Sequence, residues 1–202
     1  MKKMAKKAES TLINMLLALT LIAFVASLAL AFVNKMTKGP IEEVNKKKVA
    51  EAVAKVLPKY ESYSVDTVTV TTDKGDMPMV RYTAVDAQGA MVGQAMESWD
   101  DNGFGGKLTA MVGFDAEGNI SGYEILGSSE TPGLGAKADK WFQKDGKGNV
   151  IGKNPGTNPL MVKKDNGDVD AITGSTITSR AFCRLVTLAY SAFNNEKGEN
   201  EQ

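Results

Sequence analysis

The sequence predicts an α+β domain, built from an antiparallel sheet with flanking helices, behind a single transmembrane helix. An apolar stretch without charged residues lies near the N-terminus, from Ser10 to Asn34. Behind it the apolar residues first keep helical spacing and then alternate with polar residues, as in half-buried strands. Helical spacing returns over residues 178–193, where apolar side chains again fall on one face.

The composition excludes several classes of function. The 202 residues carry 24 basic and 24 acidic side chains, and this balance argues against nucleic-acid binding, which needs a basic surface to neutralise phosphates. The sequence has no histidine and one cysteine, Cys183, which excludes histidine-ligated metals, histidine triads and internal disulfides. We expect no metal site and no catalytic side chain, and we interpret Cys183 as an inert buried thiol. Any chemistry must come from other side chains or from a cofactor.

The apolar stretch is long enough to cross a bilayer. Between Leu12 and Val33 three polar residues interrupt it: Asn14, Thr20 and Ser27. At about 1.5 Å per residue, a helix of this length spans a hydrocarbon core of about 30 Å. A cleaved signal peptide is the alternative, since Ala29–Ala31 resembles a cleavage site, but the stretch is longer than the apolar region of such peptides. We interpret residues 1–38 as a tail and a retained anchor.

Lysines on both sides of the span bear on its orientation. Those that precede it are Lys2, Lys3, Lys6 and Lys7, and those that follow it are Lys35, Lys38, Lys46, Lys47 and Lys48. The two groups are nearly balanced. Because the four leading lysines belong to a short tail, we expect a cytoplasmic N-terminus and an extracytoplasmic C-terminal domain.

A juxtamembrane connecting helix is predicted over residues 39–58. Gly39 and Pro40 are expected to end the span, and Pro40 followed by Glu42 and Glu43 is typical of a new helix start. Apolar residues then recur at helical spacing until Pro58 stops the pattern.

Residues 59–193 form the predicted domain, and a polar tail follows over 194–202. Alternating apolar residues predict strands over residues 64–72, 79–85, 91–99, 108–114, 120–126 and 159–164. Two turns, Asp86–Gly89 and Asp115–Gly118, are of the kind that closes hairpins, so we expect antiparallel pairing. Helices are expected over 136–142 and 178–193, with an exposed excursion over 144–158.

Hydroxyl side chains crowd around one glycine in the segment Asp170–Ser179, directly ahead of the last predicted helix. Free N–H groups at a helix N-terminus stabilise an anion, Gly174 allows close approach, and the hydroxyls can donate to a phosphate or be esterified by one. The alternative is an elaborate helix cap, because Ser and Thr are favoured there for structural reasons. Spacing alone leaves both interpretations open.

The same segment resembles the flavinylation motif of the FMN-binding domain family: an Asp, two residues, Ser or Thr, Gly, a small residue and Thr. On this sequence the matching residues are Asp170, Thr173, Gly174, Ser175 and the acceptor Thr176. The resemblance implies that an FMN is joined through its phosphate to the hydroxyl of Thr176 by a dedicated flavin transferase. The family more often has Ala where Ser175 stands, so the Ser175 hydroxyl becomes a rival attachment point.

Two further stretches resemble the same family. Gly103–Gly106 resembles its glycine-rich approach to a strand, and Glu130–Gly135 resembles its ETPGLG loop. By themselves, Glu130 and Thr131 would be interpreted as residues that fix a turn. The resemblance implies instead that they bond to the isoalloxazine edge and that Leu134 contacts the ring, with Gly135 completing the expected cofactor-binding set.

Behind one transmembrane helix, these motifs resemble the family of G-type subunits of Rnf complexes, which oxidise ferredoxin, reduce NAD⁺ and pump Na⁺ or H⁺. The resemblance implies an electron-carrying subunit of the bacterial inner membrane, inactive alone, with other Rnf subunits and the flavin transferase as partners. The C-type subunit of the Na⁺-pumping NADH:quinone reductase shares this plan but is usually longer. A non-redox, membrane-tethered binding or assembly module, whose threonine-rich turn is only a helix cap, is the other alternative.

Overall fold

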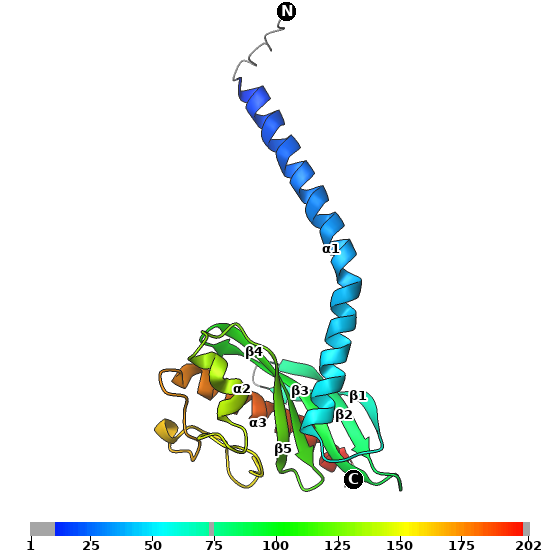
Figure 1. The fold of residues 1–202 in the computed structure, drawn as a ribbon, viewed down its shortest axis with the longest axis vertical. Helices are drawn as coiled ribbons and strands as arrows, with labels where there is room; N and C mark the ends of the chain where they lie inside the picture. The colour runs from blue at the N-terminus through cyan, green and yellow to red at the C-terminus, as the bar shows by residue number, and fades with distance from the viewer. Residues whose placement is uncertain (1–10, 73–74, 200–202) are drawn as a thin grey trace, which may run out of the picture. The chain divides into compact units, whose positions relative to one another are not determined.

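The computed structural model describes residues 11–72 and 75–199 (Figure 1). The chain divides into two units, Met1–Lys47 and Lys48–Gln202, which are described separately. Helix α1 (Leu12–Val56) begins in the first unit and ends in the second, and the sheet and the remaining helices belong to the second.

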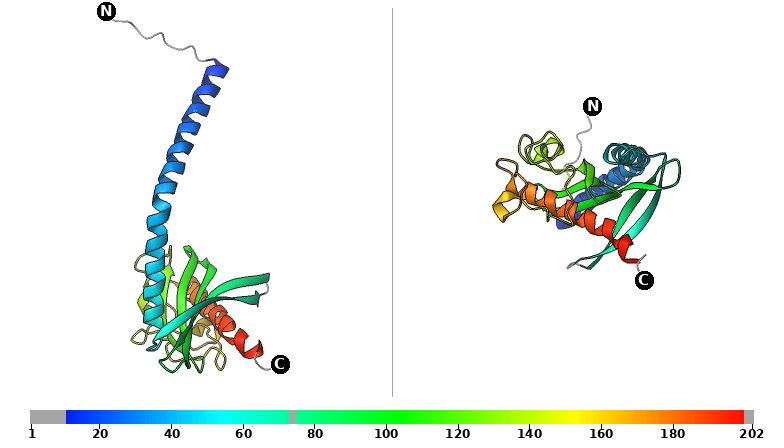
Figure 2. Two further views of the ribbon diagram at one scale, coloured as in Figure 1. Left: turned by 90° about the vertical axis from the view of Figure 1, so that its right-hand side faces the viewer. Right: turned by 90° about the horizontal axis from the view of Figure 1, so that it is seen from below.

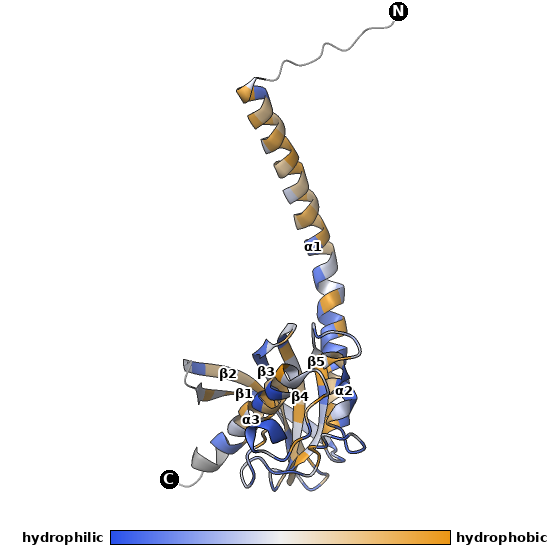
Figure 3. Cartoon of the chain, turned by 90° about the vertical axis from the view of Figure 1, so that its left-hand side faces the viewer, coloured by the Kyte–Doolittle hydropathy of each residue, from blue (hydrophilic) through white to orange (hydrophobic). Residues whose placement is uncertain are grey.

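Among the described residues, α1 is the one helix that is long and apolar enough to cross a membrane. The mean hydropathy of its most apolar stretch is 2.7. Figure 3 shows the change from hydrophobic to hydrophilic residues along this helix. The break that we expected at Gly39 and Pro40 is absent, because Pro40 lies inside the continuous helix. A proline removes only its own i→i−4 hydrogen bond, and the Lys, Glu and Ala residues that follow are strong helix formers.

The second unit is built on a five-stranded sheet in the order β1-β2-β3-β4-β5, with every neighbouring pair antiparallel. The strands are β1 (Ser62–Thr72), β2 (Gly75–Val85), β3 (Met91–Gly103), β4 (Gly106–Asp115) and β5 (Ile120–Gly127). The predicted antiparallel sheet is therefore confirmed. Strand β3 continues beyond the alternating sequence pattern because it stays paired with β4 as far as Gly103 and Gly106.

The two predicted Asp-to-Gly turns close the β2–β3 and β4–β5 hairpins. In each, one aspartate oxygen accepts two backbone N–H groups: Asp86 from Gln88 and Ala90, and Asp115 from Glu117 and Asn119. Each turn ends on a glycine with positive φ, 80° at Gly89 and 88° at Gly118, where a side chain would be strained.

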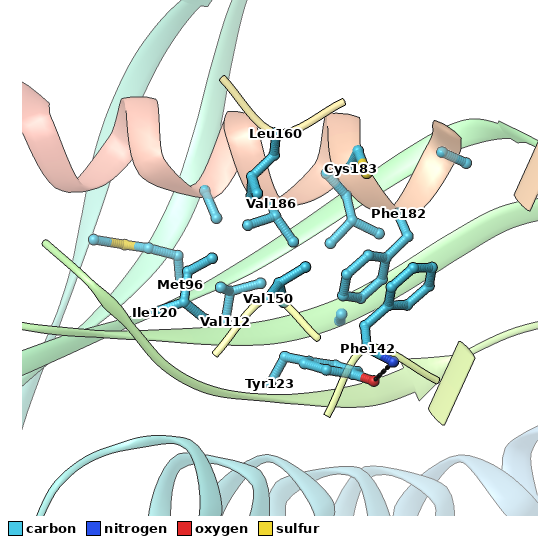
Figure 4. Packing of buried hydrophobic residues seen from close by; sticks show 14 of the residues in the cluster. Met96, Val112, Ile120, Tyr123, Phe142, Val150, Leu160, Phe182, Cys183 and Val186 are labelled. Atoms are coloured by element: carbon cyan, nitrogen blue, oxygen red, sulfur yellow. Dashed lines mark hydrogen bonds between the residues drawn. The ribbon is translucent and has the colours of Figure 1, made fainter. Parts of the chain in front are cut away.

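Helix α3 (Thr176–Glu199) lies along one face of the sheet and forms the main core with it (Figure 2). Its Phe182 stacks on Phe142 with ring centroids 4.1 Å apart, and Tyr123 packs edge-on against Phe182 (Figure 4). The Tyr123 hydroxyl donates to the Ala138 carbonyl at 2.6 Å, and burial raises the pKa of this phenol well above its usual range. The helix runs into the stretch that we predicted as a polar tail, where Asn195 donates to the Thr69 carbonyl at 2.6 Å.

The opposite face of the sheet is covered by the last turns of α1, which belong to the second unit. Ala52, Val53 and Val56 are buried there against Tyr82, Ala84, Ala95 and Met111. These strand residues alternate with those that face α3, as the pleat requires. The hydroxyl of Ser121 donates to the Val56 carbonyl at 2.5 Å, and the helix end passes so close to β4 that a Cβ on Gly113 would lie 2.2 Å from the Val56 oxygen.

Short helical turns connect the sheet to α3. They are η1 (Gly135–Lys137), α2 (Ala138–Trp141) and η2 (Lys163–Asp165). The first two confirm the helix predicted around residues 136–142. The strand predicted over residues 159–164 is wrong, because only Val162 makes a bridge, to Val169, and the chain turns at once through Asn166 with a left-handed φ of 63°.

Candidate functional site

A cavity of about 360 Å³ opens at the N-terminal end of α3. Segments far apart in the sequence meet there: the β3–β4 turn, the loop after β5, η2 and the start of α3. Its lining residues are Phe104, Glu130, Thr131, Leu134, Gly135, Lys164, Gly174, Ser175, Thr176 and Ile177. Seven of the nine predicted site residues are among them, and Asp170 and Thr173 are not.

Thr176 is the first residue of α3 and lies on the wall of the cavity. Gly174 has a φ of 78°, which turns the chain into the helix. Ser179 fixes this turn, because its hydroxyl accepts the Ile172 N–H and donates to the Ser175 carbonyl, both at 2.9 Å. The first N–H groups of α3 have no acceptor inside the helix, so this end of the cavity attracts anions.

A lysine that the sequence analysis missed lies beside the Thr176 hydroxyl. Lys164 in η2 donates from Nζ to Thr176 Oγ1 at 3.3 Å. No local pattern identifies Lys164, because the contact depends on how η2 packs next to α3. A hydroxyl, an ammonium group and helix N–H groups together form an environment suited to phosphate.

Glu130 also lines the cavity and is only 8% exposed. Its Oε2 accepts a hydrogen bond from the hydroxyl of Thr178 at 2.9 Å. Its Oε1 is buried and has no hydrogen-bond partner among the described residues. A buried carboxylate oxygen without a donor is costly, so a ligand that brings an N–H or O–H group to this point would be stabilised.

Glycines make room for this carboxylate. A Cβ at Gly135 would lie 2.4 Å from Glu130 Oε2, and a Cβ at Gly103 would lie 2.7 Å from Oε1. Real Cβ atoms do not approach so closely, so the two glycine-rich stretches that the sequence analysis singled out are needed to seat Glu130. The carboxylate therefore accepts a hydrogen bond from Thr178 and packs closely against the backbone of Gly103 and Gly135.

The mouth of the cavity is apolar. Leu134 is 43% exposed, Ile177 is 48% exposed and Phe104 is 69% exposed, although all three are large hydrophobic side chains. Thr131 is exposed beside them. A planar aromatic ligand would cover part of this surface and would gain hydrophobic free energy from it.

Asp170 and Thr173 lie outside the cavity lining. The Asp170 carboxylate forms an ion pair with Lys163 at 2.8 Å, and its backbone carbonyl accepts the indole N–H of Trp141 at 2.8 Å. Thr173 is exposed in the turn before α3. Both residues belong to the segment that leads into α3, and direct contact with a cofactor stays a prediction for them.

No group of His, Cys, Asp and Glu residues suited to a metal ion occurs in the part of the chain that the structure describes. The residues that line the cavity instead offer the Thr176 hydroxyl with Lys164 beside it, the Glu130 carboxylate with one unpartnered oxygen, and several apolar side chains. These residues fit a molecule that has a phosphate, a planar ring and a ring N–H group, and FMN has all three.

Comparison with known proteins agrees with this geometry. The FMN-binding domain family matches residues 103–191, a range that includes every residue lining the cavity. The G-type subunit of the Na⁺-translocating ferredoxin:NAD⁺ oxidoreductase complex of Acetobacterium woodii is 32% identical over 191 residues, covering 89% of this chain and 90% of that protein. The chain belongs to this family of G-type subunits.

Other relatives in the family are likewise named as the G-type subunits of ion-translocating oxidoreductase complexes. The protein from Shewanella baltica is 31% identical over 194 residues, covering 90% of this chain and 89% of its own length. The protein from Cereibacter sphaeroides is 30% identical over 188 residues, with coverages of 91% and 84%. The crystal structure of Shewanella oneidensis NqrC matches 71% of this chain and 72% of its own with a TM-score of 0.43 and 17% identity, and the family assignment does not depend on it.

Proposed function

We propose that this protein is the membrane-anchored electron carrier of an ion-translocating ferredoxin:NAD⁺ oxidoreductase complex, with FMN esterified to Thr176. The observation that carries the proposal is the position of the Thr176 hydroxyl, at a helix N-terminus and on the wall of a cavity that is also lined by Glu130, which has an unpartnered carboxylate oxygen. Family membership supports FMN as the ligand.

Thr176 is the best placed of the hydroxyls that compete for attachment. Ser175 is 7% exposed and Thr178 is 0% exposed, whereas Thr176 is half-buried. Thr178 is moreover engaged with Glu130. A transferase can therefore reach the Thr176 oxygen most easily, and this supports it over the rival Ser175.

The proposed attachment is a phosphoryl transfer. An FMN phosphomonoester is not activated, so the donor must be a flavin dinucleotide with a phosphoanhydride bond. The oxygen of Thr176 bonds to the flavin-bearing phosphorus, the anhydride bond breaks, the mononucleotide leaves and the hydroxyl proton passes to the transferase or to water. No electrons are exchanged in this step.

The residues around the cavity would then hold the flavin and exclude water. When bound, FMN supplies the redox chemistry, because it can accept and release electrons. The Glu130 carboxylate would accept a hydrogen bond from the ring N–H, and Thr131 would bond to the ring edge. Leu134 would cover the ring, while Gly135 keeps the space for the carboxylate open.

The proposed setting is the bacterial inner membrane, with the domain on the periplasmic side. The apolar window of α1 supports a single-pass anchor. The other complex subunits would supply the electron donor and acceptor, so we expect no complete turnover by the isolated chain. A covalent bond would keep the flavin in place in a compartment where free FMN is not replenished.

Mass spectrometry of the intact chain tests the attachment. Co-expression with a flavin transferase should increase the mass by one FMN less one water and give a band that fluoresces on a denaturing gel. Thr176→Ala should abolish both signals, whereas Ser175→Ala should keep them. A dark, unmodified wild-type chain would contradict the carrier proposal and leave a non-redox tethered module. Protease added to spheroplasts tests the orientation: it should digest the domain, and full protection would reverse the proposed topology.

A further inference from the structure

Two neighbouring lysines in η2 have different partners. Lys163 forms an ion pair with the Asp170 carboxylate at 2.8 Å. Lys164 forms no ion pair with a carboxylate among the described residues and instead donates to Thr176 Oγ1 at 3.3 Å. The only carboxylate among the cavity-lining residues is that of Glu130, which accepts a hydrogen bond from Thr178 and forms no ion pair with Lys164. The ammonium group of Lys164 therefore lies next to the proposed acceptor oxygen without a carboxylate paired to it among the described residues, and the carboxylate of Asp165, the next residue, interacts with its charge from a greater distance.

The backbone around Lys164 is fixed at both ends. The Lys163 N–H donates to the Val169 carbonyl at 2.9 Å, and the Val169 N–H donates to the Met161 carbonyl at 3.1 Å, which closes the turn. Asp165, the residue after Lys164, accepts two hydrogen bonds from Arg180 at 2.7 and 2.6 Å. Arg180 lies one helical turn after Thr176, so this ion pair holds η2 against the start of α3.

The pairing with Arg180 lowers the pKa of Asp165, first through the side-chain hydrogen bonds, so the carboxylate keeps its charge at neutral pH. Asp165 and Asp170 thus each bind another cation, Arg180 and Lys163. This arrangement leaves the ammonium group of Lys164 for an anion that arrives at Thr176.

We propose that Lys164 binds the phosphate of the flavin at Thr176, both while the ester forms and afterwards. The inference rests on the proposed function and adds a residue that recognises the phosphate. In the attachment step Lys164 donates a hydrogen bond to Oγ1 and stays protonated. The hydroxyl proton therefore leaves to the transferase or to water, and Lys164 offsets the charge on the phosphate oxygens while the anhydride bond breaks. After attachment, the ion pair holds the singly charged phosphodiester in place.

The test compares two adjacent lysine variants in the full-length chain. Purified, unloaded protein is incubated with flavin transferase and the flavin dinucleotide, and the modified fraction is followed by intact mass. Because charge-assisted hydrogen bonds contribute strongly, Lys164→Ala should slow attachment about tenfold, whereas Lys163→Ala should load at the wild-type rate. Lys164→Arg, which keeps the charge, should restore most of the rate.

A second measurement does not depend on the transferase. Fully loaded and unloaded forms of each variant are melted in detergent, and the rise in Tm caused by loading is compared. Wild type and Lys163→Ala should show the same rise, and Lys164→Ala should show a smaller one, while the three unloaded chains melt together. A lower Tm of unloaded Lys164→Ala alone would show a structural role and would overturn the inference.

The outcomes separate the two proposals. If the wild type accepts no flavin, the proposed function fails. If the wild type loads at Thr176 but Lys164→Ala loads as fast as Lys163→Ala and gains the same Tm, the flavin carrier stands and the role of Lys164 is overturned.

Discussion

The hydroxyl of Thr178 donates a 2.9 Å hydrogen bond to Oε2 of Glu130, a residue 48 positions away in the sequence. Thr178 lies in the same first turn of α3 as Thr176. One helical turn therefore carries both the proposed attachment oxygen and the hydroxyl that fixes the Glu130 carboxylate. Helix geometry sets the spacing between Thr176 and Thr178.

Thr178→Val should destabilise the unloaded chain by about 1–3 kcal/mol, because the nearly isosteric side chain leaves a second oxygen of the buried Glu130 without a donor. Chemical unfolding of the detergent-solubilised chain, followed by the fluorescence of Trp99 and Trp141, measures this loss. Thr176→Val is the matched control on the same turn and should stay within about 0.5 kcal/mol of wild type. Equal effects of the two variants would contradict the assigned role of Thr178.

Gly135→Ala should be destabilising, since its Cβ would lie 2.4 Å from Glu130 Oε2 and 2.7 Å from Thr178 Oγ1. Overpacking of this kind costs about 1–3 kcal/mol. At Gly127 the nearest atom to a Cβ is 3.9 Å away, so Gly127→Ala serves as the tolerated control. Melting curves of both unloaded variants check the prediction, which would be wrong if Gly135→Ala melted with the control.

Asp66 should contribute to stability in a pH-dependent way. Its side-chain hydrogen bond with Arg81, 3.0 Å from Nε, lowers its pKa below the ordinary value of 3.8. A lowered folded-state pKa gives stability that is complete above the ordinary pKa and is lost as pH falls through the folded value. The Tm difference between wild type and Asp66→Asn should therefore be constant near neutral pH and shrink below about pH 4. A difference that persists unchanged at lower pH would contradict the charged pairing.

Cys183 should resist alkylation in the folded chain. The side chain is 3% exposed, and burial raises the pKa of its thiol to about 12, so almost no thiolate forms at pH 8. Maleimide treatment followed by intact mass should show no adduct on the native protein and one adduct after denaturation, since the sequence contains a single cysteine. Rapid labelling of the native chain would indicate that the core around α3 opens easily.

Much of the sheet was predictable from the sequence because its hairpin turns depend on interactions between residues close together in the chain. The Asp86–Gly89 and Asp115–Gly118 turns are set by contacts within a few residues, so their local sequence pattern was enough to predict them. The ends of the strands were not predictable in this way. Strand β3 reaches Gly103 because β4 pairs with it, although its apolar alternation has already stopped.

The candidate site was predictable where it rests on motifs and unpredictable where it rests on packing. Thr176 and Glu130 lie in stretches that resemble a known family, and the cavity contains both. Lys164 and Thr178 act through contacts made only after η2, the loop after β5 and α3 have packed together. The strand predicted over 159–164 failed for a related reason: its apolar residues are buried by α3 and the sheet instead of by a paired strand.

The meander order of the sheet has a consequence for biosynthesis. Each strand pairs with its successor, so β1 to β5 can assemble in the order in which they are synthesised. The hydroxyl of Ser98, in contrast, must wait for its acceptor on Leu185, 87 positions later. Thr176 begins the helix that completes this core, and no acceptor oxygen or finished cavity exists on a nascent chain that ends before it. Under the proposed function, cofactor loading would therefore come after the synthesis of α3, and it would distinguish chains that contain this helix from truncated ones.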